Sequence, residues 1–234
     1  ENGSWKNASV DLKSFMPDML IISTTTPTIY DDLIICGLAK GINPGMLTVA
    51  KGAHFSVFDK EILTMFRTLD VAIRGEAEVS IKEIYRSKDY NQILGITFRN
   101  KAEIIRNDDR AFLENLDTLP FPARHLLNNN LYRTPDTDEP IAFINASRGC
   151  AGGCIFCPAA LISGCKVRMR SIKSVAGEIE ECINRYKISN FFFASDTFTW
   201  NKQWVIGLCQ EILNRGLVIR WGANSRVDTL DQDM

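Results

Sequence analysis

Four cysteines in the second half of the chain are the residues whose type and spacing most clearly indicate chemistry. Cys150, Cys154 and Cys157 are separated by three and then by two residues, and Cys165 follows shortly after. Thiolates are the usual protein ligands of iron–sulfur clusters. Three glycines in the segment 149–153 permit the positive φ angles that a tight wrap around a metal group needs. The segment therefore predicts a metal or redox site rather than disulfides.

Two kinds of metal site compete for these cysteines. Three cysteines holding a four-iron cluster leave one iron without a protein ligand, and that open position can bind a small molecule, as it does in catalytic zinc sites. Alternatively, Cys165 completes a tetrahedral set of four ligands around a structural zinc ion. The loop follows a predicted strand at 141–144 and opens a β-α pattern, which favours the cluster. Zinc stays the alternative.

Polar residues follow the next two predicted strands. Ser195 and Asp196 come after a strand at 191–194, and Ser225 and Arg226 come after one at 217–221. Side chains just past the ends of such strands face the mouth of a β/α barrel, and an arginine there can bind a carboxylate through two hydrogen bonds. The simpler interpretation is that Asp196 caps the next helix and that Arg226 forms a surface ion pair.

The elements that must position these residues fall into two β-α series. In the first half the pattern predicts a doubly wound, Rossmann-like α/β sheet with a small hairpin appended to it. In the second half it predicts the first part of a β/α barrel, with Glu178, Glu180 and Glu181 on the solvent side of a helix. The proline-rich segment between them predicts a linker. The expected domains are 1–106 and 138–234, joined by a linker at 107–137. The expected elements of the first half are strands at 19–24, 46–50 and 71–74, helices at 29–40, 59–69 and 77–86, and hairpin strands at 94–99 and 102–106. In the second half, helices are expected at 172–186 and 204–215.

Composition places the chain among ordinary globular proteins. Of its 234 residues, 45% are hydrophobic and 24% are charged, and the net charge is −1. This balance gives no signal for a nucleic-acid surface, and no apolar run reaches the length of a membrane span. The location is predicted to be cytoplasmic. Cys36, Cys182 and Cys209 are predicted to be buried structural thiols, and both chain ends read as cuts in a longer protein.

The cysteine segment is similar to the signature of the radical S-adenosylmethionine (SAM) superfamily, because Cys-x-x-x-Cys-x-Phe-Cys directly follows the predicted first barrel strand. The resemblance implies that Cys150, Cys154 and Cys157 bind a 4Fe–4S cluster and that SAM chelates the fourth iron. It places Phe156 near the adenine, Ser195 or Asp196 near the amino group, and Ser225 and Arg226 near the ribose and carboxylate. The implied reaction is reductive cleavage of SAM to a 5′-deoxyadenosyl radical, fed by an electron donor such as flavodoxin or ferredoxin. No residue of the chain is assigned a catalytic role.

The first half resembles the cobalamin-binding domain of one subgroup of that superfamily. The similarity lies in the turns 23–27 and 51–54 and in the segment 74–78. It implies that Ser23, Thr24, Thr25, Gly52 and His54 line the pocket for the nucleotide tail of cobalamin. Two departures stand out: the turn 51–54 reads Lys-Gly-Ala-His instead of Gly-Gly-Pro-His, and the Asp-x-His-x-x-Gly cobalt-ligand motif is absent.

The subgroup implies two enzymatic functions. The first is a cobalamin-dependent methyltransferase, and the second is an anaerobic oxidative cyclase of the magnesium-protoporphyrin monomethyl ester type. A zinc-stabilised binding module is the non-enzymatic alternative. The sequence does not identify the substrate.

Overall fold

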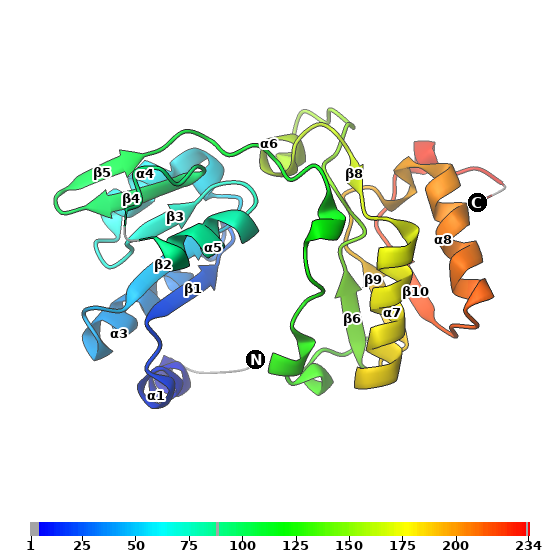
Figure 1. Cartoon of the computed structure of the whole chain (residues 1–234), viewed down its shortest axis with the longest axis horizontal. Coiled ribbons are helices and arrows are strands. Elements are labelled where there is room, and N and C mark those ends of the chain that lie inside the picture. Colours follow the sequence, from blue (N-terminus) through cyan, green and yellow to red (C-terminus); the bar gives the residue numbers. More distant parts are fainter. Residues whose placement is uncertain (1–4, 88, 233) are drawn as a thin grey trace. The chain divides into compact units, whose positions relative to one another are not determined.

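The computed structural model describes residues 5–87, 89–232 and 234, and the chain divides into two compact units. The first unit spans Glu1–Phe112 and the second spans Leu113–Met234. Figure 1 shows a β-sheet with helices in each unit. The division falls inside the predicted linker at 107–137, and the later part of that segment belongs to the second unit.

The first unit is built on a five-stranded sheet in the order β1-β2-β3-β4-β5. Its first three strands run parallel and the last two are antiparallel. The predicted hairpin is therefore not a small appendage: β4 pairs directly with β3, because Ile96 and Phe98 on its inner face are buried in the same core as Val71 and Ile73. The strands are β1 (Met19–Ser23), β2 (Leu47–Lys51), β3 (Val71–Ile73), β4 (Ile96–Asn100) and β5 (Glu103–Arg106).

Helices cover both faces of this sheet. Successive side chains along a strand point to opposite faces, and on the central strands both sets are buried. On the central strands, Ala50 and Ala72 pack in one cluster with α2, α3 and α4, whereas Val49 and Val71 pack in another cluster with α5. The doubly wound fold is thus confirmed (Figure 1). The helix α1 was not predicted from the sequence. The helices are α1 (Trp5–Phe15), α2 (Ile29–Asp32), α3 (Ile34–Ile42), α4 (Phe55–Met65) and α5 (Glu78–Arg86).

The second unit contains a three-stranded parallel sheet in the order β10-β9-β6. Ala142 and Ile144 of β6 are buried against α7 and α8, while Phe143 between them is 56% exposed. The helices α7 and α8 therefore cover one face of this sheet (Figure 1). This arrangement is that of the first strands of a β/α barrel. Its elements are β6 (Ile141–Ile144), α7 (Ile172–Tyr186), β9 (Asn190–Phe193), α8 (Lys202–Asn214) and β10 (Arg220–Ala223).

One glutamate that the sequence pattern places on the solvent side of α7 is buried instead. Glu178 is only 1% exposed and accepts hydrogen bonds from Arg124, at 2.6 Å, and from Arg170. Arg124 lies in η2 (Arg124–Leu126), within the segment predicted to be a linker, and also donates to the carbonyl of Phe143 at 2.9 Å. A buried carboxylate needs such partners, because an unpaired charge in the interior is costly. The prediction for Glu178 was wrong because helical periodicity does not reveal partners from distant segments.

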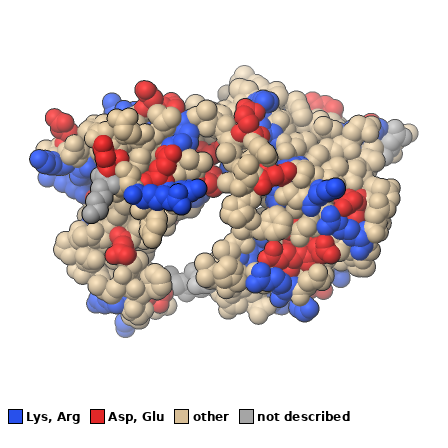
Figure 2. Space-filling view, viewed as in Figure 1, with Lys and Arg blue, Asp and Glu red and all other residues tan. Residues whose placement is uncertain are grey.

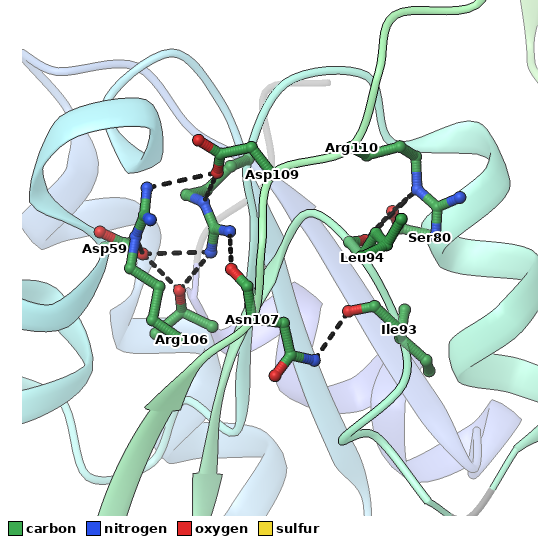
Figure 3. A network of polar contacts seen from close by, with 10 residues as sticks. Asp59, Ser80, Ile93, Leu94, Arg106, Asn107, Asp109 and Arg110 are labelled. Atoms are coloured by element: carbon green, nitrogen blue, oxygen red, sulfur yellow. Dashed lines mark hydrogen bonds and ion pairs between the residues drawn. The ribbon is translucent and has the colours of Figure 1, made fainter.

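A second buried ion network fastens the end of the sheet in the first unit (Figure 3). Arg74, which follows β3, donates to Asp109 at 2.8 Å and contacts Asp59 at 3.3 Å. Arg106 at the end of β5 donates to the same Asp59 carboxylate at 3.0 Å. Arg74 also donates to the backbone carbonyl of Asn107 at 2.5 Å. The segment that leaves the sheet after β5 is thus held against β3 and α4.

The surface carries both signs of charge. Figure 2 shows acidic and basic side chains interspersed on the visible face of each unit, in keeping with the net charge of −1. Within the described residues, no helix combines the length and apolar character that a membrane crossing requires.

Candidate functional site

The cysteine segment is framed by a two-stranded antiparallel ribbon that the sequence pattern did not reveal. Its strands are β7 (Ser147–Arg148) and β8 (Arg168–Met169), and the short helix α6 (Ala159–Ser163) lies between them in sequence. Gly149 has a φ of +90°, and a side chain there would overlap the carbonyl of Lys166. The amide of Cys150 donates to the carbonyl of Gly164 at 3.0 Å. The base of the loop is therefore closed by backbone contacts.

The four thiols of this loop are free and differ in exposure. Cys150 and Cys154 are partly buried, whereas Cys157 and Cys165 are exposed. Phe156, predicted to lie near an adenine, is 88% exposed. Within the described part of the chain, no three His, Cys, Asp or Glu side chains gather closely enough to hold a metal ion.

The donor chemistry of the loop nevertheless fits an iron–sulfur cluster. The three cysteines of the signature are thiols on one glycine-rich loop, and soft thiolate ligands are those that such clusters take. The amide of Gly152 donates to Cys150 Sγ at 3.4 Å, so the backbone of the loop holds that sulfur in place. The residues present thus suit the cluster that the sequence resemblance implies.

Arg226 reaches this loop from the segment after β10. Its Nη1 donates to Cys154 Sγ at 3.3 Å, across 72 positions of sequence. Its Nε and Nη2 form a fork with the two carboxylate oxygens of Asp228, at 2.8 and 2.6 Å. The hydrogen bond to Asp228 and, to a smaller extent, the one to Cys154 raise the pKa of Arg226. The same hydrogen bond with Arg226 lowers the pKa of Asp228. The fork predicted to bind a SAM carboxylate is therefore occupied by a neighbouring side chain.

Ser195 and Asp196 differ sharply although they adjoin each other at the end of β9. Ser195 is 4% exposed, and its hydroxyl has no hydrogen-bond partner among the described residues. Asp196 is exposed. A buried hydroxyl without a partner is unfavourable and calls for an explanation. A polar ligand at this strand end would supply the missing partner, which agrees with the predicted role of Ser195.

A cluster of hydroxyl groups links the loops after β9 and β10, and sequence reasoning found only one member of it. Thr199 is 8% exposed and hydrogen-bonds both Ser225 and Thr229, the latter at 2.6 Å. The amide of Phe198 also donates to the carbonyl of Asn224 at 2.9 Å. Threonines are common in loops, so no sequence signal distinguished Thr199 or Thr229 from surface residues.

In the first unit, the predicted cobalamin residues lie at the carboxyl ends of β1 and β2. The amide of Thr24 donates to the carbonyl of Lys51 at 2.9 Å, and Gly52, with a φ of +149°, lies so close to Thr24 that any side chain would overlap its carbonyl. His54 Nδ1 lies 3.2 Å from the hydroxyl of Thr26, and its ring packs on Phe58.

The remaining two predicted residues of this edge have different surroundings. Ser23 and Thr25 are exposed, and the Thr25 hydroxyl lies 2.8 Å from that of Thr28. Thr28 is the residue at the N-cap position of α2, so neither Thr24 nor Thr25 caps that helix. The structure thus brings Thr24, Gly52 and His54 to one edge of the sheet, where Gly52 permits close backbone approach.

Comparison with known proteins gives a consistent set of relatives. The chain is 30% identical over 225 residues to an uncharacterized methyltransferase of Pyrococcus horikoshii, covering 94% of this chain and 49% of the relative. It is 28% identical over 235 residues to the anaerobic magnesium-protoporphyrin IX monomethyl ester cyclase of Cereibacter sphaeroides, covering 95% of this chain and 37% of the relative. The chain therefore spans half or less of the length of these relatives. No protein-family profile matches it.

Solved structures share the fold. The radical SAM methyltransferase TsrM from Kitasatospora setae, with cobalamin and a 4Fe–4S cluster bound, superposes with a TM-score of 0.68 at 16% identity, over 91% of this chain and 43% of that protein. The cobalamin-dependent SAM radical enzyme OxsB, with aqua-cobalamin and SAM bound, gives a TM-score of 0.73 at 15% identity, over 100% of this chain and 34% of that protein. The chain thus shares with these two proteins the fold of a doubly wound α/β unit followed by the first strands of a β/α barrel.

Proposed function

We propose that this chain, which is related in sequence and in fold to radical SAM enzymes with an N-terminal cobalamin-binding domain, belongs to a cobalamin-dependent radical SAM methyltransferase. The observation that supports this most directly is the set of three free thiols on the loop after β6, at the carboxyl end of a parallel sheet. Cys150, Cys154 and Cys157 would hold a 4Fe–4S cluster. A cluster bound there would supply the electron for the reductive cleavage of SAM.

The residues of the chain itself would bind and orient SAM. Ser195 offers a buried hydroxyl that lacks a partner, which suits a polar group of a ligand at the end of β9. Asp196 follows β9 and Ser225 follows β10, and we propose them as further SAM contacts. Phe156, on the exposed part of the cysteine loop, offers an aromatic surface for the adenine.

In the first unit, Thr24 and Gly52 would form part of the surface for the nucleotide tail of cobalamin, because they meet at the carboxyl ends of β1 and β2, where Gly52 lets the two turns pack closely together. Ser23, Thr25 and His54 complete this proposed surface. The small side chains and backbone groups at these two strand ends suit recognition of a phosphate-containing ligand.

The test of the cluster assignment is anaerobic reconstitution with iron and sulfide. We expect about four irons per chain, and an electron paramagnetic resonance (EPR) spectrum of the reduced protein that changes when SAM is added. Uptake of zinc alone, without a cluster signal, would overturn the proposal and favour the zinc-binding module. In that case Cys165→Ala should lower zinc content, because Cys165 would be the fourth ligand.

Anaerobic oxidative cyclisation is the second candidate function, and the cyclase relative supports it. The cobalt content of the purified protein and the chemical products of the reaction separate the two functions. A methyltransferase retains cobalamin and transfers a methyl group from SAM, whereas a cyclase forms a ring without methyl transfer. The measurement is mass spectrometry of products formed with SAM carrying a deuterated methyl group.

Three further predictions accompany the proposed function. A low-potential protein such as flavodoxin or ferredoxin would supply electrons to the cluster. The location would be cytoplasmic. The domains would be 1–106 and 138–234, with a linker at 107–137.

A further inference from the structure

The contact between Arg226 and Cys154 is a feature that the proposed function leaves unexplained. Arg226 was predicted to bind the SAM carboxylate, yet its fork is paired with Asp228 and its remaining Nη1 donates to Cys154 Sγ at 3.3 Å. Both Cys154 and Arg226 are partly buried. The guanidinium thus serves a proposed cluster ligand rather than presenting a free fork to a substrate.

Gly152 provides a second, independent observation. Its φ is not positive, so backbone conformation does not explain a glycine at this position. A Cβ added there would lie 3.1 Å from Arg226 Nη1 and 3.3 Å from Cys150 Sγ. A methyl group at Gly152 would therefore crowd the guanidinium where it meets the cysteine loop and would require it to shift by a few tenths of an ångström.

The backbone of Arg226 is also held in place. The Thr229 hydroxyl donates to the Arg226 carbonyl at 2.9 Å, and the Thr229 amide donates to the same carbonyl at 3.2 Å. Thr199 connects Thr229 and Ser225 to the loop after β9. The position of the guanidinium therefore rests on a network of hydroxyl groups that joins two strand ends.

We propose that Arg226 is a positioning residue for the cluster, which orients the Cys154 thiolate and makes one-electron reduction of the cluster more favourable. The physical reason is that reduction adds negative charge to the cluster and its ligands, and a nearby cation that donates a hydrogen bond stabilises that charge. Hydrogen bonds to the sulfurs and the net charge around a cluster are among the factors that set its reduction potential. This inference rests on the proposed function, because it requires a cluster on the three cysteines.

The experiment is an EPR-monitored redox titration of the reconstituted protein in the absence of SAM, with dithionite as reductant. We expect Arg226→Met to disfavour reduction about tenfold, which is about 59 mV toward lower potential for a one-electron couple. Gly152→Ala should shift the potential in the same direction by a smaller amount, because the added methyl group displaces the guanidinium. The matched control is Arg215→Met, because Arg215 forms ion pairs with Glu180 of α7 and Glu211 of α8. The cluster potential of this variant should equal that of the wild type.

The same titration repeated with SAM separates the competing roles. If Arg226→Met has the wild-type potential without SAM but loses the spectral change on SAM addition, Arg226 binds the SAM carboxylate and the inference is overturned. If Arg226→Met takes up less iron, the titration is done with Arg226→Lys. Lysine keeps the positive charge but lacks the fork that pairs with Asp228 and orients Nη1 toward Cys154. An unchanged potential and spectrum in Arg226→Lys would contradict a role for the directed hydrogen bond. A wild-type protein that forms no cluster would instead refute the proposed function itself.

Discussion

In the first unit the turns after β1 and β2 lie in direct backbone contact, whereas in the second unit the loop after β6 carries exposed side chains. Gly52 and Thr24 are so close that the turn geometry is fixed by the backbone itself. Cys157 and Phe156, in contrast, lie on the exposed part of a loop whose base is closed through Gly149 and the ribbon β7–β8. Both edges follow the carboxyl ends of parallel strands.

The two units differ in which segments are held rigidly by packing and buried ion pairs. In the second unit, the buried Arg124–Glu178 pair anchors the strand end and α7, leaving the cysteine loop outside this rigid frame. In the first unit, the buried Arg74–Asp59 pair anchors the end of β3, but the turns after β1 and β2 are themselves tightly packed. A preformed turn suits recognition by backbone groups, and a loop of exposed thiols suits a group that itself organises its ligands.

The largest expected effect concerns the cysteine loop. Replacement of Cys150, Cys154 or Cys157 by alanine should abolish cluster uptake, because each would remove one of three iron ligands. Cys165→Ala is the matched control and should leave iron and sulfide content unchanged. Chemical analysis of iron and sulfide after reconstitution measures both. Equal loss in the Cys165 variant would contradict the three-ligand site.

The buried anchor of the second unit should be the next most sensitive position. Glu178→Gln should lower the free energy of unfolding by about 3–5 kcal/mol, because Arg124 and Arg170 would lose their shared anion in the interior. Glu180→Gln, on the same helix but half-exposed beside Arg215, should cost about 1 kcal/mol or less. Urea denaturation followed by circular dichroism compares the two. Similar losses would mean that burial of the pair does not determine its importance.

The tight turn of the first unit predicts a smaller effect. Gly52→Ala should lower the free energy of unfolding by about 1–3 kcal/mol, since the φ of +149° is unfavourable for alanine. The overlap with the Thr24 carbonyl adds to that cost. Gly37→Ala in α3 should instead stabilise by up to about 1 kcal/mol, because a Cβ there meets nothing within 4 Å and alanine favours a helix. Thermal denaturation distinguishes them. A neutral Gly52 variant would show that this turn is not rigid.

The smallest expected effect is a loss of folding stability at alkaline pH, and it involves the buried thiol of Cys36. Burial raises its pKa from 9.0 to about 12, so the folded protein keeps the thiol protonated while the unfolded chain ionises it. The stabilising contribution of Cys36 is therefore complete below pH 9 and declines as the pH rises from 9 toward 12. The stability difference between wild type and Cys36→Ala should shrink by about 1 kcal/mol between pH 8 and pH 10.

Urea denaturation at the two pH values tests this prediction. Alkylation followed by mass spectrometry extends it to the comparison of the two regions: the exposed Cys157 and Cys165 should react at pH 8, and the buried Cys36 and Cys182 should not. Rapid modification of Cys36 in the folded protein would show that its environment opens to solvent.

Much of the molecule follows from the sequence alone. The spacing of Cys150, Cys154 and Cys157 and the alternation of apolar runs are local properties, so they predicted the thiol donors and the β-α order of both units. The helix over 172–186 and the strand over 141–144 have the predicted bounds. Local pattern was enough there because each element carries its own periodicity and turn residues.

Tertiary structure alone decided which distant residues meet. The pairing of β4 with β3, the closing ribbon β7–β8 and the burial of Glu178 each join segments whose sequences carry no mark of one another. The clearest case is Arg226, which reaches Cys154 across 72 positions and lies close to Gly152. The spacing of the cysteines along the chain fixes which thiols share a loop, but only the packing of the whole unit determines which charged side chain, here Arg226, lies beside them.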